Sequence, residues 1–423
     1  MPDTARPAAP STHADLAAEL LPDDLLATIR ERAAAHDRDN TFFDDDLAAL
    51  RERGYLRLLV PTAMGGLGAS VQDAARLQRR LAQAAPATAL GINMHLVVTG
   101  AALVALHRGL DAARGILEDA ARDRLFAFGI SEGGNDAMLF DSFTRAERTD
   151  AGLALSGTKI FTSMAPAWDR LVVHAKLVDE QGELPPVGEG ELVFGTLARE
   201  RGGDGALVEA PGVETLDDWD THGMRASQSR TTRLTGTVLA PEAELTRMPA
   251  GPGPNPFAFG IFGVFEILLA AVYTGIGERA VQIAAGIATS RRSRTAGIAF
   301  ADDPAIRWRL ADAAIELDGA ILQIERIAAD LDALRADAPT PGATDHGPRF
   351  FLHFSGVKHR ATEAALHAVD EALRSAGGAH YSRGGELERI SRDVRAGLYQ
   401  PSDAESVHAS YARALLGEVG AER

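Results

Sequence analysis

The distribution of apolar positions along the chain divides it into three regions. Over residues 21–124 apolar side chains recur mostly at three- and four-residue spacings, which is typical of helices. Over 125–241 short aromatic and β-branched runs alternate with Gly, Asp and Pro turns, and this pattern predicts a small antiparallel β domain. Helical periodicity returns at 254–416, interrupted by a loop over 338–348. The sequence therefore predicts a multidomain α+β protein, with a β-barrel or sandwich between an N-terminal helical domain and a C-terminal helical bundle.

The predicted boundaries define four segments. Residues 1–20 are polar and lack the apolar core of a secretory signal, so we expect a flexible N-terminal arm and a cytoplasmic protein. An N-terminal helical domain over 21–124 and a β domain over 125–245 follow, and a C-terminal four-helix-type domain occupies 246–423. Division into domains is expected because a chain of 423 residues exceeds the size at which single cores stop growing.

The longest apolar run extends over 257–277 and carries one charge, Glu266. About 20 apolar residues suffice to span a bilayer, and no second run of this kind stands out. The central charge, the glycines at Gly260 and Gly263 and a mean hydropathy of -0.07 instead favour the core helix of a soluble domain. A carboxylate buried there must find partners or keep its proton, so Glu266 is either a structural oddity or a poised base.

Composition excludes several classes of partner and chemistry. A net charge of -16 argues against nucleic acid or an anionic membrane as partner, because a phosphate footprint needs clustered Lys and Arg. The chain has no cysteine, which excludes disulfides, thiolate catalysis and Cys-ligated metals. The scattered histidines lack a ligand spacing backed by a carboxylate, so no metal site is predicted.

Several short strings carry a family resemblance. In chain order they are GYLRLLVPTAMGGLG, FGISEGGND, LSGTKIFTS, THGMRASQS, RTTRLTGTVLAP, SRRSR and AGGAHYSRGGELERISRDVR. Their order over nearly the whole chain resembles the acyl-CoA dehydrogenase superfamily of flavoproteins. The resemblance implies a helix–β–helix architecture and FAD as cofactor, with FMN as the alternative.

The resemblance assigns four residues of the β domain to the flavin. Phe161, Thr162 and Ser163 match an aromatic residue and a hydroxyl beside the ring, and Ser131 matches a second hydroxyl. A flavin ring requires an apolar wall and donors directed at the edge where reduced flavin gathers negative charge. Without the resemblance, Phe161 would be interpreted as a core aromatic and the hydroxyls as strand surface residues.

A second set of matches lies in the C-terminal region. Arg291, with Arg292 and Arg294 nearby, resembles the arginine end of the helix that reaches the cofactor of a neighbouring subunit, and Gly377 and Gly378 resemble the paired glycines there. Glycines let backbone approach a cofactor closely. The resemblance therefore implies a homodimer or homotetramer. A solvated basic helix end followed by an ordinary glycine cap is the alternative.

The chain departs from the family at the usual catalytic acid. Gln400 and Pro401 stand where the common form has its glutamate and glycine, and Ser402 stands where a cofactor-contacting hydroxyl belongs. Because glutamine cannot take a proton at neutral pH, a dehydrogenase of this sequence would need its base elsewhere. Asp403 and Glu405 lie further along the chain and are weaker candidates.

Some family members carry the base on the first long helix of the third domain, and Glu266 falls at or beside that position. An apolar helix would raise its pKa toward the range that proton abstraction from a thioester requires. The alternative is a glutamate buried for packing or paired with an arginine such as Arg279.

Three functions remain open. The first is an FAD-dependent α,β-desaturation of an acyl thioester, bound to coenzyme A or a carrier protein, with an electron-transferring flavoprotein as electron acceptor. The second is a two-component flavin-dependent monooxygenase served by a flavin reductase, a class that often carries a histidine near the vacant position. His380 and His408 flank that position but are expected to be ordinary surface or helix residues. The third is a catalytically silent flavin-binding homologue.

Overall fold

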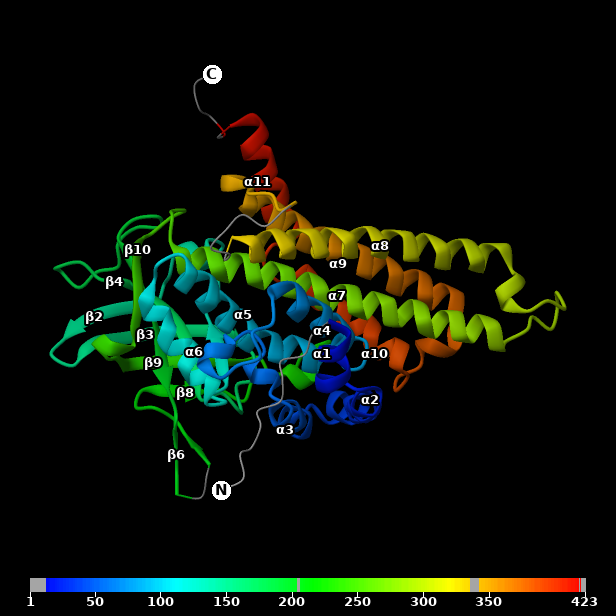
Figure 1. The fold of residues 1–423 in the computed structure, drawn as a ribbon, viewed down its shortest axis with the longest axis horizontal. Helices are drawn as coiled ribbons and strands as arrows, with labels where there is room; N and C mark the ends of the chain where they lie inside the picture. Colours follow the sequence, from blue (N-terminus) through cyan, green and yellow to red (C-terminus); the bar gives the residue numbers. More distant parts are fainter. Residues whose placement is uncertain (1–12, 204–205, 335–341, 418, 420–423) are drawn as a thin grey trace.

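The computed structural model describes residues 13–203, 206–334, 342–417 and 419. A β-sheet occupies one end of the molecule and a bundle of long helices extends away from it (Figure 1). The N-terminal helices lie against the region where the sheet and the bundle meet (Figure 1). This arrangement confirms the predicted order of helical domain, β domain and helical bundle.

The N-terminal region is helical, as predicted. Its helices are α1 (His13–Leu20), α2 (Asp23–Asp39), α3 (Asp44–Glu52), η1 (Tyr55–Arg57), η2 (Thr62–Met64), α4 (Val71–Ala82), α5 (Pro86–His107), η3 (Asp111–Ala113) and α6 (Arg114–Ala121). The predicted flexible arm is wrong from His13 onward, since α1 buries Leu16 and Leu20, which lie one turn apart on one face. The remainder of that arm, 1–12, lies outside the described residues.

The middle region forms a mixed sheet with the strand order β10-β5-β4-β2-β3-β9-β8, and β1 also pairs with β4. A separate ribbon joins β6 to β7. The elements are β1 (Phe126–Gly129), η4 (Met138–Phe140), β2 (Arg145–Thr149), β3 (Gly152–Thr162), β4 (Arg170–Leu177), β5 (Glu191–Ala198), β6 (Glu200–Arg201), β7 (Leu207–Val208), β8 (Val213–Thr215), η5 (Arg225–Ser227), β9 (Arg230–Leu239), η6 (Pro241–Ala243) and β10 (Glu244–Pro249).

Two strand pairs correct the expectation of a purely antiparallel domain. β1 runs parallel to the first half of β4, and β2 runs parallel to its last residues, where Arg145 lies opposite Lys176. The two strands thus lie one after the other along β4, separated by the loop that contains η4. Side chains alternate with the same period in parallel and antiparallel strands, so the sequence pattern carried no information on direction. β10 also ends at Pro249, beyond the predicted boundary at 245.

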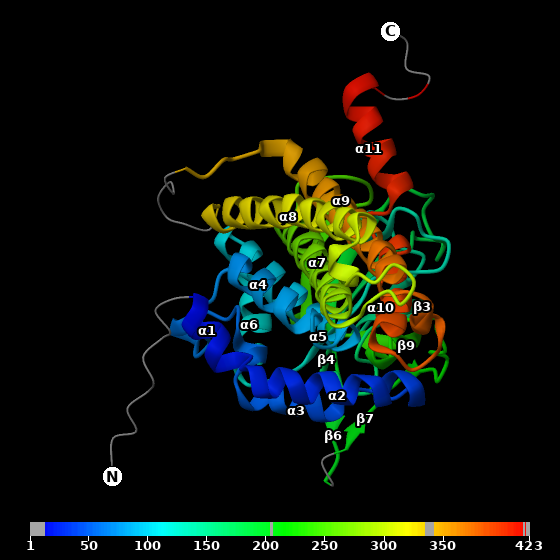
Figure 2. The same ribbon diagram turned by 90° about the vertical axis from the view of Figure 1, so that its right-hand side faces the viewer.

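The C-terminal region is a helical bundle, as predicted. It contains α7 (Pro256–Ser290), η7 (Phe300–Asp302), α8 (Pro304–Ala333), η8 (Gly347–Arg349), α9 (Phe350–Ala376), η9 (Gly378–Tyr381), α10 (Glu386–Asp393), η10 (Val394–Leu398) and α11 (Ala404–Leu416). Seen along the bundle, α7 lies in the middle, with α4, α5, α8 and α9 around it (Figure 2). This central position explains why α7 is apolar on all sides.

Two helices are long and apolar enough to cross a membrane among the described residues, α5 and α7. The expectation of a single such run overlooked α5. In the tested window 94% of the residues of α5 and 83% of those of α7 are buried inside the protein. Both are therefore core helices of this fold, because core helices meet the same criteria of length and hydropathy as membrane spans.

Close packing around α7 gives a first prediction. A Cβ atom at Gly275 would lie 2.3 Å from the carbonyl oxygen of Arg79 on α4, so Gly275→Ala must push two helices apart. We expect it to lower the free energy of unfolding by about 3 kcal/mol. Gly286 is the matched control, since it is exposed on the same helix and a Cβ atom there would meet no atom within 4 Å. Gly286→Ala should raise stability by about 0.5–1 kcal/mol. Urea denaturation of both variants checks this, and equal stabilities would contradict it.

Candidate active site

A cavity of about 1430 Å³ lies between the β domain and the N-terminal half of α7. It is also bounded by the start of α9, by the loop that follows β1, and by the segment after α10. Cavities for one small ligand usually measure about 300–1,000 Å³. This cavity therefore has room for a cofactor and a second ligand together.

The structure places three of the four predicted flavin residues of the β domain on this cavity. Ser131, Phe161 and Ser163 line it. Phe161 is 53% exposed and adopts φ +58°, a left-handed conformation that is strained for a residue with a side chain. Its carbonyl accepts a hydrogen bond from the amide of Ser163 at 2.9 Å, so the chain turns tightly here. This strained turn holds an aromatic face out into the cavity.

Thr162 corrects the fourth assignment. Its side chain is fully buried and is not part of the cavity wall. Because neighbouring side chains of a strand point to opposite faces, Thr162 cannot share the cavity with Phe161 and Ser163. The hydroxyl of Thr162 is therefore not a flavin contact in this geometry.

The sequence did not predict a row of hydrogen-bonded serine hydroxyl groups. The Oγ atom of Ser229 lies 2.8 Å from Oγ of Ser163 and 2.8 Å from Oγ of Ser227, and all three serines are buried. Ser163 and Ser229 also line the cavity. The string THGMRASQS contained the signal, two serines two positions apart before a strand, but only the tertiary fold brings them to β3.

Glu266 lies on the cavity wall with only 1% of its surface exposed. Its Oε1 atom accepts a hydrogen bond from Oγ of Ser402 at 2.7 Å. Its Oε2 atom has no hydrogen-bond partner within the described residues. Burial raises the pKa of Glu266 to about 7, although the charge of Lys358 and the Ser402 hydrogen bond oppose the rise. The structure thus contains a buried carboxylate with a raised pKa, and its role as a base stays a prediction.

The alternative pairing of Glu266 with Arg279 is wrong. Arg279 instead makes a two-point ion pair with Glu386, with both nitrogen–oxygen distances at 2.8 Å. The two residues of α7 are 13 positions apart, so their side chains lie about 20 Å apart along the helix axis.

Gln400 lines the cavity, and its side chain is hydrogen-bonded to a tyrosine. Its Oε1 atom accepts a hydrogen bond from the hydroxyl of Tyr273 at 2.7 Å. The backbone around it is held by Lys358, whose buried Nζ donates to the carbonyls of Gly397 at 2.8 Å, Gln400 at 2.8 Å and Ser402 at 3.2 Å. Burial lowers the pKa of Lys358 to about 8. Sequence reasoning missed this residue, whose only signal was a lysine on an otherwise apolar face of α9.

The weaker candidates for acid–base chemistry lie off the cavity. Asp403 caps the N-terminus of α11 by accepting from the amide of Ser406, and Glu405 is exposed. His408 is exposed and bonds to the carbonyl of Ala404, and His380 lies in η9. None of the four candidates lines the cavity.

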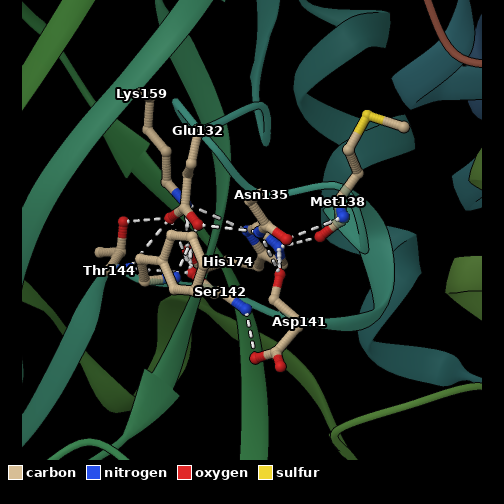
Figure 3. Close-up of polar contacts among 9 residues, drawn as sticks. Glu132, Asn135, Met138, Asp141, Ser142, Thr144, Lys159 and His174 are labelled. Carbon is tan, nitrogen blue, oxygen red and sulfur yellow. Dashed lines mark hydrogen bonds and ion pairs between the residues drawn. The ribbon is translucent and has the colours of Figure 1, made fainter. Parts of the chain in front are cut away.

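A buried polar network fixes the loop between β1 and β2 (Figure 3). At its centre Glu132 accepts hydrogen bonds from Nζ of Lys159 at 2.6 Å, from the backbone amides of Phe143 and Thr144 at 2.6 and 3.0 Å, and from neighbouring side chains. Those side chains are Asn135, Ser142 and Thr144. Since residues 135–141 of this loop line the cavity, the network shapes one of its walls.

Electrostatics in this network follow from burial. Burial alone would raise the pKa of Glu132, but Lys159, His174 and the hydrogen bonds outweigh it and hold that pKa well below its usual range. Burial and the charge of Lys159 lower the pKa of His174 to about 4, so the imidazole is neutral at pH 7. Its Nε2 atom then donates to the carbonyl of Asp141 at 2.8 Å, and its Nδ1 atom accepts from Lys159 at 3.1 Å.

The residues matched to a neighbouring subunit's cofactor lie far from this cavity. Arg291 follows the C-terminal end of α7, about 37 Å along the helix from Glu266. Its guanidinium donates to the carbonyl of Ala376, next to Gly377 and Gly378, so the structure brings the three predicted residues together. A Cβ atom at either glycine would meet no atom of this chain within 4 Å. Their role toward a cofactor stays a prediction.

The ionised state of Glu266 gives a second prediction. The pKa of Glu266 is about 7 in the folded chain, against an ordinary 4.5, so the unfolded state releases this proton first as pH rises. The free energy of unfolding should therefore fall by about 3 kcal/mol between roughly pH 4.5 and 7 on account of this group alone. The difference between wild type and Glu266→Gln, measured by urea denaturation across that range, isolates the effect. A difference independent of pH would contradict it.

No group of three or more His, Asp or Glu residues that could hold a metal ion occurs in the part of the chain that the structure describes. The chemistry of the cavity wall instead suits a flavin. It offers an exposed aromatic face at Phe161 and hydroxyl groups at Ser131, Ser163 and Ser229. An apolar wall with donors at its edge is what an isoalloxazine ring requires.

Comparison with known proteins agrees with this geometry. The family model "Acyl-CoA dehydrogenase, N-terminal domain" matches residues 23–108, and "Acyl-CoA dehydrogenase, C-terminal domain" matches 267–400. YdbM of Bacillus subtilis, whose provisional name is acyl-CoA dehydrogenase, is 28% identical over 89% of this chain and 91% of its own length. L-evernosamine nitrososynthase of a Micromonospora species is 29% identical over 91% of this chain and 88% of its own.

Two further similarities are to a monooxygenase and to a flavin-bound structure. Dibenzothiophene monooxygenase of Rhodococcus erythropolis is 28% identical, over 86% of this chain and 85% of its own length. The structure of KijD3 in complex with FMN and a dTDP-linked amino sugar superposes with a TM-score of 0.81 and 27% identity, covering 98% of this chain and 97% of that one. Together with the two domain matches, these similarities show that the chain belongs to the acyl-CoA dehydrogenase superfamily of flavoprotein oxidoreductases.

Proposed function

We propose that this chain is a flavin-dependent monooxygenase that receives reduced flavin from a separate reductase and oxidises a small organic substrate with molecular oxygen. The observation that carries the proposal is Gln400, which replaces the usual dehydrogenase acid and is held by the hydroxyl of Tyr273 at 2.7 Å. An amide in that place cannot abstract a proton. The nitrososynthase and monooxygenase relatives, matched over most of the chain, support the same conclusion.

The residues of the cavity have separate tasks in this function. The flavin, when bound, supplies the electrons with which oxygen is activated. The face of Phe161 would support the flavin ring. Because Ser163 and Ser229 share one hydrogen bond, one hydroxyl hydrogen of this pair would remain to donate toward the ring. Glu266 lies on the cavity wall, and its Oε2 atom has no hydrogen-bond partner among the described residues, so it can accept a hydrogen bond or a proton from a substrate N–H or O–H group.

A second candidate function is favoured by the same Glu266. Its raised pKa of about 7 suits the abstraction of the α-proton of an acyl thioester, the first step of α,β-desaturation. In that function electrons would leave through an electron-transferring flavoprotein. The monooxygenase consumes molecular oxygen and the desaturase does not, so an experiment can separate the two functions.

The decisive experiment compares two reactions of the purified chain. In the first, FMN or FAD reduced by a flavin reductase is mixed with labelled dioxygen and a panel of amines, thioethers and phenols, and mass spectrometry follows the gain of a labelled oxygen atom. In the second, the FAD-loaded chain is mixed anaerobically with acyl-CoA thioesters, and bleaching of the flavin is recorded. Oxygen incorporation without bleaching supports the monooxygenase.

The variants Glu266→Gln and Gln400→Glu sharpen the comparison. If acyl-CoA thioesters bleach the flavin of the wild type but not that of Glu266→Gln, with flavin still bound, the desaturase is supported and the monooxygenase is refuted. Gln400→Glu restores a carboxylate at the usual position and should not raise oxygen incorporation. A chain that binds neither oxidised nor reduced flavin would overturn both functions.

We also propose that the chain acts as a homodimer or homotetramer. Trp308, Ile315 and Leu322 on α8 are 74%, 69% and 69% exposed and recur every seven residues, a spacing typical of helices that pack on another helix. The open surroundings of Gly377 and Gly378 suit the approach of a partner's cofactor. Light scattering should show that Ile315→Asp lowers the molar mass, whereas Glu316→Gln on the neighbouring exposed position does not. A wild-type monomer would refute the proposal.

A further inference from the structure

One part of the cavity wall consists of phenylalanine rings from three separate segments. The ring centroid of Phe351, at the start of α9, lies 5.7 Å from that of Phe259, 5.2 Å from that of Phe262 and 6.4 Å from that of Phe140. All four side chains are half-buried and line the cavity, so part of each ring faces its interior. We call these four residues the aromatic wall. Such edge-to-face clusters offer both ring faces and ring edges to a planar ligand.

Arg108 stands over this aromatic wall. Its guanidinium carbon lies 4.8 Å from the ring centroid of Phe259, and its side chain is exposed and lines the cavity. Arg392 and Arg395, which also line the cavity, are paired with carboxylates. Arg108 forms no ion pair with any carboxylate over the described ranges. Its charge is therefore available to an anion in the cavity.

Glu266 defines the other end of the same stretch of wall. Phe259, Phe262 and Glu266 are spaced three and seven residues apart, so they share one face of α7. With about 1.5 Å per residue, roughly 10 Å of helix separates Phe259 from Glu266. This separation is comparable to the length of two fused aromatic rings with their substituents, so we infer a ligand of about that length between Arg108, which contacts Phe259, and Glu266.

We propose that the substrate is an elongated aromatic molecule with an anionic substituent bound by Arg108 and an N–H or O–H group that donates to Glu266. Its rings pack on the aromatic wall, and the guanidinium holds its carboxylate or sulfonate by charge-assisted hydrogen bonds. The N–H or O–H end of the molecule is the end that is oxidised. The identification of this molecule as a substrate therefore rests on the proposed monooxygenase function.

The test measures binding to the full chain with oxidised FMN present, by isothermal titration calorimetry. The probes are a hydroxynaphthoate with its carboxylate and hydroxyl at opposite ends, the corresponding naphthol without the carboxylate, and the shorter hydroxybenzoate. Hydroxynaphthoate should bind at least tenfold more tightly than either of the others. Arg108→Ala should weaken its binding about tenfold, or ~1.4 kcal/mol, and leave naphthol unchanged.

Two further variants act as controls. Phe262→Ala should weaken both naphthyl probes, whereas Arg114→Ala, which removes an exposed arginine at the start of α6 outside the cavity, should change neither. Equal affinities for hydroxynaphthoate and naphthol, or no effect of Arg108→Ala, would overturn the inference. Tighter binding of dTDP or coenzyme A than of any naphthyl probe would also overturn it.

The inference and the proposed function can fail separately. Incorporation of oxygen into a neutral amine or thioether, with no binding of hydroxynaphthoate, would support the monooxygenase and refute the aromatic anion as substrate. Binding of hydroxynaphthoate that depends on Arg108, with no oxygen incorporation into any substrate, would keep the binding site and refute the monooxygenase.

Discussion

Glu132→Ala is expected to lower the free energy of unfolding by about 3–5 kcal/mol, because it leaves the buried ammonium of Lys159 without its carboxylate. The side chains of both residues are almost fully buried, at 3% and 0% exposure, so water cannot replace the lost partner. The backbone amides of Phe143 and Thr144 also lose their acceptor. Urea denaturation measures the loss, and faster hydrogen exchange at these two amides locates it.

Two variants make this result specific. Glu147→Ala removes an exposed carboxylate on β2 that pairs with Arg145, and it should change stability by less than about 0.5 kcal/mol. Glu132→Gln combined with Lys159→Met removes both charges and should recover part of the loss, as a double-mutant cycle would reveal. A Glu132→Ala chain within about 1 kcal/mol of wild type would show that the network adds little.

Lys358→Met is expected to have the second large effect. Methionine keeps the apolar length of the side chain but removes the donor to the three carbonyls of Gly397, Gln400 and Ser402. Each buried acceptor left without a donor costs about 1–3 kcal/mol, so a total loss of at least roughly 3 kcal/mol is expected. The pKa of Glu266 should also rise further above 7, since the positive charge that opposes the rise is gone.

Both effects can be read from one set of denaturation curves. Stability of Lys358→Met, with and without Glu266→Gln, is measured from acid to alkaline pH, and the pH above which the difference stops changing gives the folded-state pKa of Glu266. Arg360→Met is the control on the exposed side of α9, where a change of less than about 0.5 kcal/mol is expected. If the difference levels off at the same pH with and without Lys358→Met, the charge of Lys358 does not affect the pKa of Glu266.

The sequence predicted the three-region fold because each region has its own period of apolar positions. It could not predict that β1 and β2 run parallel to β4, since strand direction leaves no trace in that period. It also misjudged residues 13–20, where two leucines one turn apart form a short helix within an otherwise polar segment. These differences concern contacts between distant parts of the chain.

In the candidate site, too, some residues were predictable from the sequence and others were not. Glu266 was predictable as a buried carboxylate, because an isolated charge in an apolar run stands out. Lys358 was not, since its electrostatic effect on Glu266 depends on folding that brings together residues 92 positions apart. The pairing of Glu132 with Lys159 was likewise hidden, although both residues lie within the strings that carried the family resemblance. Only the folded chain brings such groups together.

The unpartnered oxygen of Glu266 has a consequence for protein engineering. Above neutral pH this residue lowers stability, and most routes to a more robust protein begin by removing such liabilities. A library selected only for survival of heating at pH 8 should therefore accumulate neutral residues at position 266. Thermostable descendants of this protein would need a simultaneous screen for turnover, because a stabilising substitution at position 266 would remove the carboxylate on which the proposed function depends.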